Sequence, residues 1–207
     1  MRPVGLEDVL GRDRYAAARD AIRRRLIAHK QTRRCAVGDR LTLVFEDRAT
    51  VWYQTQEMLW IEHVTDLDAM RDELAVYNAL LPGPDDLSAT LLIEIEDQGR
   101  IREELQRLIG IDERLALEIG DAGRTAARFE PGRTTAEKLA AVQYVRFPLT
   151  RPLRSALAGG APLVVVAEHP AYAVRAAVPE RVRASLAADV RDPDAADRAL
   201  AMVRGDA

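Results

Sequence analysis

The sequence predicts an α+β fold, in which a curved, mostly antiparallel sheet of six or seven strands carries helices on one face. Three observations support this prediction. Amphipathic helical patterns occupy much of the first 81 residues, short β-branched runs joined by tight turns fill most of the remainder, and two stretches repeat one β-α-β-β order of elements. Strands that are joined by short turns pair antiparallel, so we expect a mainly antiparallel sheet.

The first part of the chain predicts an N-terminal helix over residues 6–28, with a break near Gly11. Residues 32–39 read as a polar connection, and the β-branched and aromatic run at 41–45 predicts a strand. An antiparallel helical hairpin is expected over residues 51–81. Its signals are Thr50 as an N-cap, Thr65 and Asp68 as a capping box at the second helix, and a stop at Pro82-Gly83-Pro84.

Residues 88–178 form the sheet-rich half, in which two β-α-β-β-like units follow one another. The first runs from the strand TLLIEIED through a helix at 100–109 to the hairpin of LALEIGD and RTAARFE, and the second runs from VQYVRFPL to YAVRAAV. The similarity could reflect duplication or merely a common order of elements. Residues 1–190, ending in a helix at 179–190, are expected to form one domain, and 191–207 a tail or short helix.

Composition indicates a globular protein, with 48% hydrophobic and 30% charged residues. The single cysteine, Cys35, excludes a disulfide framework and a cysteine-based metal centre within one chain. We find neither the apolar segment of a signal peptide nor an apolar run long enough to span a membrane. We therefore expect a cytoplasmic protein without a membrane partner.

Charge is distributed unevenly, because residues 1–40 hold eleven Lys/Arg against five Asp/Glu while the net charge of the chain is −3. A basic arm can bind nucleic acid, which is one alternative function. The arginines of the first helix alternate with apolar positions, however, which favours a solvated helix face. Tyr15 is the only aromatic residue beside them that could stack on a base.

The candidate site lies in the helical hairpin and the strand after it, where uncharged polar groups and carboxylates sit among bulky apolar side chains. Such groups either find hydrogen-bond partners when buried or form a site. The residues that we expect to bind a ligand or partner are Gln54, Glu57, Tyr77, Asn78, Glu94 and Glu96. The alternative is a structural network that joins the hairpin groups, together with Gln56, to backbone and arginine groups.

A metal site is a second interpretation of the same hairpin. Glu57 and His63 lie six residues apart and point about 120° apart on one helix, so that helix alone cannot build the site. Glu57 and Glu73 are expected at one level of the hairpin, so the metal-ligand set would be Glu57 and Glu73, with Glu62 or His63. Such ligands suit a divalent metal, which would make the protein a metal-dependent enzyme.

Four sequence strings resemble the bacterial domain-of-unknown-function family 3501. They are RRCAVGDRLTLVFEDRATVWYQTQEMLWIEHV, ELAVYNALLPGPDDLSATLLIEIED, AVQYVRFPL and EHPAY, which together span most of the chain. The resemblance implies no established activity and no catalytic residues. Genes of that family tend to lie beside genes for rubrerythrin-like proteins and iron–sulfur oxidoreductases. The resemblance therefore implies an oxidative-stress or iron-linked setting, with proteins of those two kinds as partners.

The sequence lacks the common nucleotide-binding and hydrolase motifs. We therefore expect a non-catalytic accessory or binding protein of a cytoplasmic redox pathway that contacts a protein partner or a small ligand. The metal-dependent enzyme and the nucleic-acid-binding protein remain the alternatives, and the sequence leaves the oligomeric state open.

Overall fold

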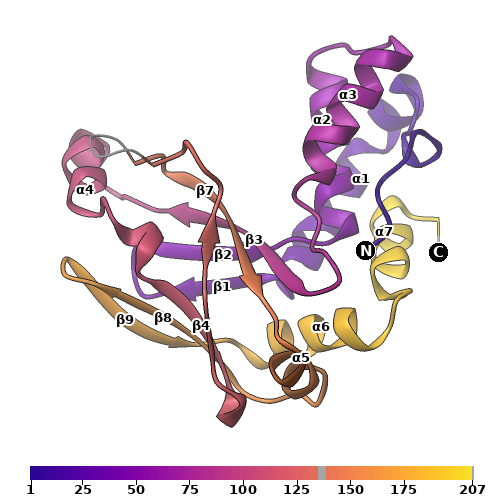
Figure 1. The fold of residues 1–207 in the computed structure, drawn as a ribbon. Coiled ribbons are helices and arrows are strands. Elements are labelled where there is room, and N and C mark those ends of the chain that lie inside the picture. The colour runs from indigo at the N-terminus through magenta and orange to yellow at the C-terminus, as the bar shows by residue number, and fades with distance from the viewer. Residues whose placement is uncertain (135–138, 207) are drawn as a thin grey trace.

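The computed structural model describes residues 1–134 and 139–206, which form a helical lobe and a two-sheet lobe side by side (Figure 1). The α+β class predicted from the sequence is confirmed. Both ends of the chain lie at the helical lobe (Figure 1). Residues 135–138 of the expected sheet-rich half lie outside the described residues. None of the described helices is long and apolar enough to cross a lipid bilayer.

The helical lobe is built from α1 (Arg12–Lys30), α2 (Arg48–Ile61), α3 (Leu67–Asn78) and α7 (Ala195–Arg204). The predicted break near Gly11 is confirmed, because Gly11 precedes α1 and a short 3-10 helix (Leu6–Asp8) lies before it. The helices bury one apolar cluster that includes Tyr15, Trp52 and Leu200. The C-terminal segment, for which the sequence left a tail or a short helix open, is thus a packed helix.

The helix caps differ from the predicted ones. Asp47 rather than Thr50 caps α2, because the Asp47 carboxylate accepts the Thr50 N–H over 2.9 Å while the Thr50 hydroxyl accepts the Asp47 N–H over 3.0 Å. Asp66 rather than Thr65 caps α3, with its carboxylate accepting two backbone N–H groups. In both helices the residue directly before the first turn is an aspartate, and its carboxylate accepts the backbone N–H groups that the threonine was expected to accept.

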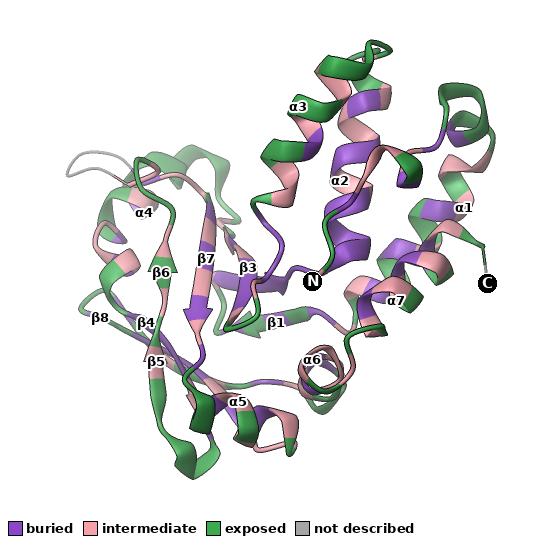
Figure 2. Cartoon of the chain, turned by 45° about the vertical axis from the view of Figure 1, so that its right-hand side comes forward, coloured by how far each residue is buried: buried purple, intermediate pink, exposed green. Residues whose placement is uncertain are grey.

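The strands are all antiparallel, but they form two sheets rather than one. In the first sheet the order is β1 (Arg34–Val37), β2 (Leu41–Phe45), β3 (Asp86–Ile93), β7 (Val142–Pro148) and β6 (Arg128–Phe129). In the second sheet it is β5 (Arg124–Ala126), β4 (Leu115–Ile119), β8 (Leu163–His169) and β9 (Tyr172–Ala177). Each sheet buries one face against the other, and this shared core includes Phe45, Phe147, Leu117 and Val165 (Figure 2).

Two predicted boundaries are wrong. Residues 34–37, expected within a polar connection, form β1, because Cys35 and Val37 point into the core while their neighbours face outward. The strand expected at residues 90–97 lies at Asp86–Ile93, so Glu94 and Glu96 follow the strand instead of sharing one of its faces. The strand ends there because its partner β2 begins at Leu41, which pairs with Ile93.

The two β-α-β-β units are present as β3, α4 (Ile101–Arg107), β4 and β5, and as β7, α5 (Arg151–Ala158), β8 and β9. Their strands occupy equivalent places. The first strands, β3 and β7, pair in one sheet, and the second strands, β4 and β8, pair at the centre of the other, with β5 and β9 at its two edges. In each sheet, a strand of the first unit therefore pairs with the corresponding strand of the second unit.

The remaining helices are α6 (Glu180–Arg191), which connects the two lobes, and three short 3-10 helices. Helix α6 follows the second sheet and leads into α7 of the helical lobe (Figure 1). Its buried residues Val182 and Leu186 belong to the core of the two-sheet lobe. Short 3-10 helices occupy Gln98–Arg100, Ile111–Glu113 and Gly120–Ala122. Helix α6 therefore places charged side chains at the junction between the lobes.

Candidate ligand pocket between the lobes

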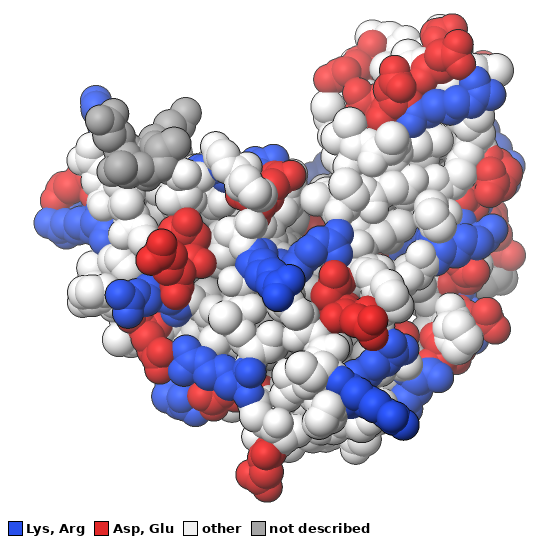
Figure 3. Space-filling view, in the orientation of Figure 1, with Lys and Arg blue, Asp and Glu red and all other residues white. Residues whose placement is uncertain are grey.

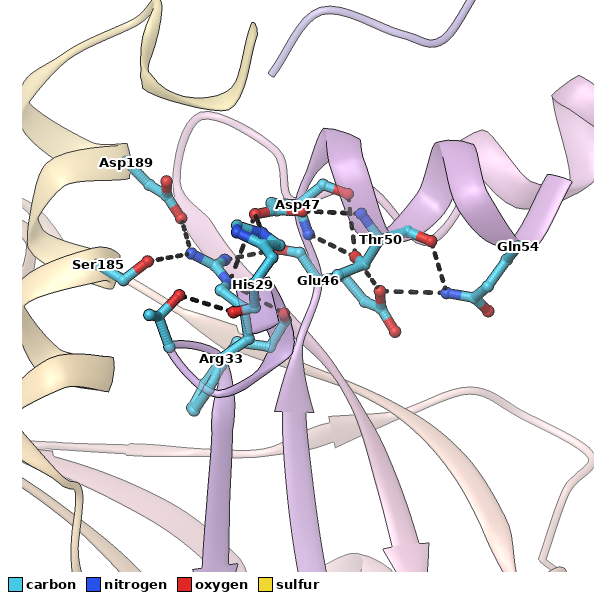
Figure 4. A network of polar contacts seen from close by, with 10 residues as sticks. His29, Arg33, Glu46, Asp47, Thr50, Gln54, Ser185 and Asp189 are labelled. Atoms are coloured by element: carbon cyan, nitrogen blue, oxygen red, sulfur yellow. Dashed lines mark hydrogen bonds and ion pairs between the residues drawn. The ribbon is translucent and has the colours of Figure 1, made fainter. Parts of the chain in front are cut away.

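A buried guanidinium holds the lobe junction together. The Arg33 side chain is 1% exposed, and its Nη1 donates to Asp189 Oδ2 over 2.6 Å and to Ser185 Oγ over 3.0 Å, both on α6 (Figure 4). Its Nε and Nη2 donate to the backbone oxygens of Phe45 and Glu46 over 3.1 and 3.0 Å. Four of the five guanidinium hydrogens are therefore used, which fixes the side chain and links α6 to the end of β2.

Asp47 lies beside this arginine and is equally buried. Its Oδ2 is 2.6 Å from His29 Nε2 and 3.6 Å from Arg33 Nε. Burial alone would raise the pKa of Asp47, but Arg33 and His29 together outweigh it and lower the pKa to about 2. Burial raises the pKa of Asp189, and the negative charge of nearby Asp47 raises it further. Together these two effects outweigh the contact with Arg33, which lowers it. Arg33 is thus shared between two carboxylates.

The Glu46 carboxyl group points away from Arg33, toward α2 (Figure 4). It accepts hydrogen bonds from the hydroxyls of Thr50 and Thr90 and from Gln54 Nε2, the last over 3.2 Å. Burial raises the pKa of Glu46, since only hydrogen bonds and the more distant Lys30 oppose the loss of water. This part of the network is a satisfied, closed polar cluster.

A pocket of about 600 Å³ opens on the other side of Arg33. Its walls come from residues 1–2, the loop 82–86 after α3, the start of β3, Arg154 of α5, the C-terminal end of α6 and the turn into α7. Ligand pockets commonly have volumes of roughly 300–1,000 Å³ and lie where structural units meet. This pocket, which we call the interlobe pocket, fits both criteria.

Three of the five carboxylates that line the pocket are paired with an arginine. Asp86 is 2.9 Å from Arg146 Nη1, and Asp197 is 2.9 Å from Arg48 Nη1. Asp189 is held by Arg33, as described above. These three carboxylates are therefore largely neutralised, whereas no ion pair with an arginine is formed by Glu46 or Asp194 among the described residues, so some negative charge remains in the pocket.

Ser88, which lines the interlobe pocket, is only 4% exposed. Its hydroxyl forms no hydrogen bond with the residues that the structure describes, and the oxygen is not among the fully enclosed unpaired side-chain atoms. Buried polar groups are usually paired. An accessible, unpaired hydroxyl in a pocket wall is therefore a group that a bound molecule could satisfy.

The hairpin residues singled out from the sequence lie elsewhere. Glu57 faces α1, where it accepts from Arg19 Nε and Nη2 over 2.8 and 2.6 Å and from the Tyr15 hydroxyl. Asn78 exchanges hydrogen bonds of 2.8 and 2.9 Å with the Val4 backbone. Gln56 does the same with the Leu10 backbone. These contacts match the alternative of a structural network joining hairpin groups to backbone and arginine groups.

The remaining predicted residues do not converge either. Gln54 contacts Glu46 and the Thr50 backbone, and Tyr77 lies half-buried against the helical core. Glu94 is 2.5 Å from Arg34 Nη2 and accepts from the Thr42 hydroxyl, while Glu96 is exposed. The six residues therefore do not form one site.

The four residues proposed as metal ligands are also dispersed. Glu57 is occupied by α1, whereas Glu62 and His63 are exposed at the end of α2, where His63 has a φ of 56°. Glu73 is half-buried on α3. Among residues 1–134 and 139–206 there is no group of three or more His, Cys, Asp or Glu side chains placed to hold a metal ion. The geometry gives the metal interpretation no support.

The basic first helix uses several of its arginines within the protein. Arg19 binds Glu57 and stacks 4.3 Å from the centroid of the Trp60 ring, and Arg25 donates to the Val203 and Arg204 backbone. Tyr15 is fully buried, so it cannot stack on a base. These contacts favour a structural and solvated role for this helix.

A concave surface lies between the α2–α3 hairpin and the two-sheet lobe, and acidic side chains gather at the hairpin tip (Figure 3). Thr90 and Tyr144 are paired across β3 and β7 on the face of the first sheet that does not face the second sheet. Tyr77 of α3 and Tyr144 both pack against the helical core. The hairpin and the sheet thus present half-buried tyrosines on adjoining surfaces.

Sequence reasoning missed Arg33, Ser88, Arg154 and Asp189. Two of them left a signal. The in-and-out alternation of β1, with Cys35 and Val37 inside, places Arg33 on the buried side. Asp189 follows Val182 and Leu186 on the apolar face of α6. A charge on a buried face predicts a buried partner, but the pattern does not identify that partner.

Comparisons with known proteins agree with the fold. A family model described as "Protein of unknown function (DUF3501)" matches residues 3–190, which confirms the resemblance found in the sequence. A crystal structure of a novel protein of unknown function from Burkholderia pseudomallei K96243 is similar, with 38% sequence identity and a TM-score of 0.86. The similarity covers 91% of this chain and 99% of that one. No curated protein matches the chain.

Proposed function

This chain belongs to the DUF3501 family of proteins of unknown function, and we propose that it is a non-catalytic binding protein that holds a small polar ligand in the interlobe pocket. The observation that carries this proposal is the unpaired hydroxyl of Ser88 in a pocket of about 600 Å³. A bound molecule would give that hydroxyl the partner that buried polar groups normally have.

Rigidity of the pocket wall supports the same proposal. Arg33 is held by four hydrogen bonds, and Asp86 by Arg146 and by the Gly83 N–H over 2.7 Å. Side chains that are already fixed lose little conformational entropy when a ligand binds. The pocket is therefore organised before binding, as ligand sites usually are.

Retention of a small molecule tests the proposal. Native mass spectrometry of the intact protein, purified from its own cells, is expected to show a bound molecule. Val190→Trp would fill the pocket from α6, and Val76→Trp, at a position 64% exposed on α3, is the matched control. We expect the bound mass in the wild type and in the control but not in Val190→Trp, with all three folded by circular dichroism. The same mass in all three, or none in the wild type, contradicts the proposal.

We further propose that the protein works in the cytoplasm, in a redox or oxidative-stress pathway with a rubrerythrin-like or iron–sulfur partner. This part rests on the family's gene neighbourhood, and the docking surface we propose is formed by the half-buried side chains of Tyr77 on α3 and Tyr144 on β7. Anaerobic co-purification of the full chain with reduced partners tests it. Tyr77→Ser is expected to reduce recovery of the partner, and Arg175→Gln, on the second sheet, is expected to leave it unchanged. Equal recovery with both variants, or none with wild type, counts against it.

A further inference from the structure

Resting on the proposed function, we infer that the ligand of the interlobe pocket is a small carboxylate with an aliphatic body. The argument begins with the positive groups of the pocket wall. Arg154 donates through Nη1 to the Pro84 backbone oxygen and lies 3.4 Å from Asp85 Oδ1, whereas its Nε and Nη2 have no partner among the residues described. Arg191 uses only Nε, in a 3.3 Å contact with the Ala187 backbone oxygen. Both side chains therefore keep guanidinium donors for an anion.

The start of α7 adds partial positive charge at the same place. Helix α7 has ten residues, and its N-cap Asp194 and first-turn Asp197 line the pocket. The Ala195 N–H donates to the Asp192 backbone oxygen over 3.2 Å, and because the side chain of Asp194 does not cap the helix, the next N–H groups are left to other acceptors. The N-terminus of a helix attracts anions through these groups and through the helix dipole.

The accessible hydroxyl of Ser88 is an independent indication that an acceptor binds here. Its residue is 4% exposed, and it lines the pocket without a hydrogen-bond partner in the described part of the chain. A hydroxyl can donate to a carboxylate oxygen in a charge-assisted hydrogen bond, which is stronger than one between neutral groups. Guanidinium donors, a helix N-terminus and a hydroxyl together favour an anionic oxygen group.

The other residues of the pocket wall favour a ligand with a single negative charge. Four arginines and five acidic residues line the pocket, so a dianion such as a phosphate ester would meet strong repulsion as well as attraction. A carboxylate carries a single negative charge. The pocket lining also includes the apolar residues Leu87, Leu149, Leu186 and Val190, which favour an aliphatic chain on the ligand.

Titration calorimetry with a matched series of six-carbon compounds tests the inference. We expect hexanoate to bind wild-type protein at least tenfold more tightly than hexanol, hexylamine or hexyl phosphate. Arg154→Gln and Ser88→Ala are expected to weaken hexanoate binding at least tenfold and threefold. Arg71→Gln, which removes a comparable exposed arginine paired with Asp68, is the control and should bind as the wild type does.

The outcomes separate the ligand class from the pocket function. Hexanol or hexylamine binding as tightly as hexanoate, or an unchanged affinity in Arg154→Gln, overturns the inference. Tighter binding of hexyl phosphate would assign the site to phosphate esters instead. Loss of the native bound molecule in Val190→Trp together with no hexanoate binding would leave the pocket function standing and reject only the carboxylate. Equal hexanoate binding to Val190→Trp would place the molecule outside the pocket and reject both.

Discussion

Arg33 and Asp189 are 156 residues apart in the sequence and form a 2.6 Å ion pair at the junction of the two lobes. The arginine is 1% exposed and the aspartate 10%. A buried pair of this kind adds little net stability over a well-packed apolar pair, but losing one partner leaves a charge without compensation. Its main effect is therefore to require α6 and the end of β2 to meet in one arrangement.

Removing both members of the pair should cost less stability than the sum of the two single removals. Asp189→Ala is expected to lower the free energy of unfolding by about 3 kcal/mol, because Arg33 would keep a buried charge beside Asp47 alone. The double variant Arg33→Met with Asp189→Leu is expected to cost less than the sum of the two single changes, because Asp189 no longer keeps a buried charge without its arginine, while Asp47 retains His29. Urea unfolding measures the single and double variants. As a control, Asp68→Ala removes an exposed pair with Arg71 and should cost less than about 1 kcal/mol. Additive losses in the double variant would contradict this account.

Asp47 predicts a defined pH dependence. Its folded pKa, about 2, is lower than the ordinary 3.8, so the carboxylate contributes stability that is complete above about pH 4 and disappears as pH falls through about 2. The stability difference between wild type and Asp47→Asn, on the order of 2 kcal/mol at neutral pH, should therefore narrow between about pH 4 and pH 2. The pKa values of Glu46 and Asp189 shift the opposite way, and Asp47 contributes to both shifts, so Asp47→Asn should also lower these two pKa values and change the stability difference above about pH 4. Urea unfolding across this range checks it, and a difference independent of pH would refute it.

Glu57 should act as a structural residue and not as a metal ligand. Glu57→Gln removes the charge that accepts two hydrogen bonds from Arg19, and we expect a loss of about 1–2 kcal/mol in unfolding free energy. Arg19 lowers the pKa of Glu57, so the effect should diminish in acid. Glu62→Gln, at an exposed position, is the control. Elemental analysis should find equal metal in all three proteins; a drop confined to Glu57→Gln would restore the metal hypothesis.

The contact between Gly38, next to the first sheet, and Tyr172 of the second sheet allows a test of how closely the two sheets pack. Gly38 has a φ of +71°, and a Cβ there would lie 2.2 Å from the Tyr172 hydroxyl, which donates to the Val37 backbone oxygen over 2.6 Å. Gly38→Ala should therefore cost more than Gly132→Ala, where φ is +86° but no atom lies within 4 Å and only backbone strain of about 1–2 kcal/mol applies.

The same change in a Tyr172→Phe background isolates the clash. Without the hydroxyl, the nearest ring atom to the added Cβ is 3.1 Å away, so Gly38→Ala should cost clearly less there than in the wild type. Thermal unfolding of the four proteins of the cycle measures the coupling. Equal costs in both backgrounds would show that the strained backbone, and not the tyrosine, sets the penalty.

How much of the fold the sequence could predict depends on how far along the chain each sequence signal acts. The helical hairpin was predictable because its helical periodicity and the stop at Pro82-Gly83-Pro84 are local signals, even though the caps were assigned to the wrong residues. The order β-α-β-β was predictable for the same reason. The division into two sheets was not, because β4 reads as a strand whichever partner it chooses, and only the burial of both its faces assigns it to a second layer.

The site was harder to predict than the fold. Gln54, Glu57 and Asn78 attracted attention because they are polar residues among apolar ones, and the structure shows that each has a partner within the protein. The pocket instead combines Arg154 and Ser88 with α6 and α7, and these segments are joined by the fold and not by sequence proximity. No local pattern encodes such a meeting, so sequence periodicity could not reveal it.

The last prediction concerns α7, which lies beyond the part of the chain that the family model matches. Leu200 is 2% exposed within the helical core, so Leu200→Ala should lower the unfolding free energy by about 2–4 kcal/mol. Met202, on the same helix, is 46% exposed, and Met202→Ala should change it by less than about 0.5 kcal/mol. Urea unfolding compares the two. A frayed tail would make both changes equally harmless, whereas a docked helix makes them differ, because only Leu200 leaves a cavity against its neighbours when it is shortened.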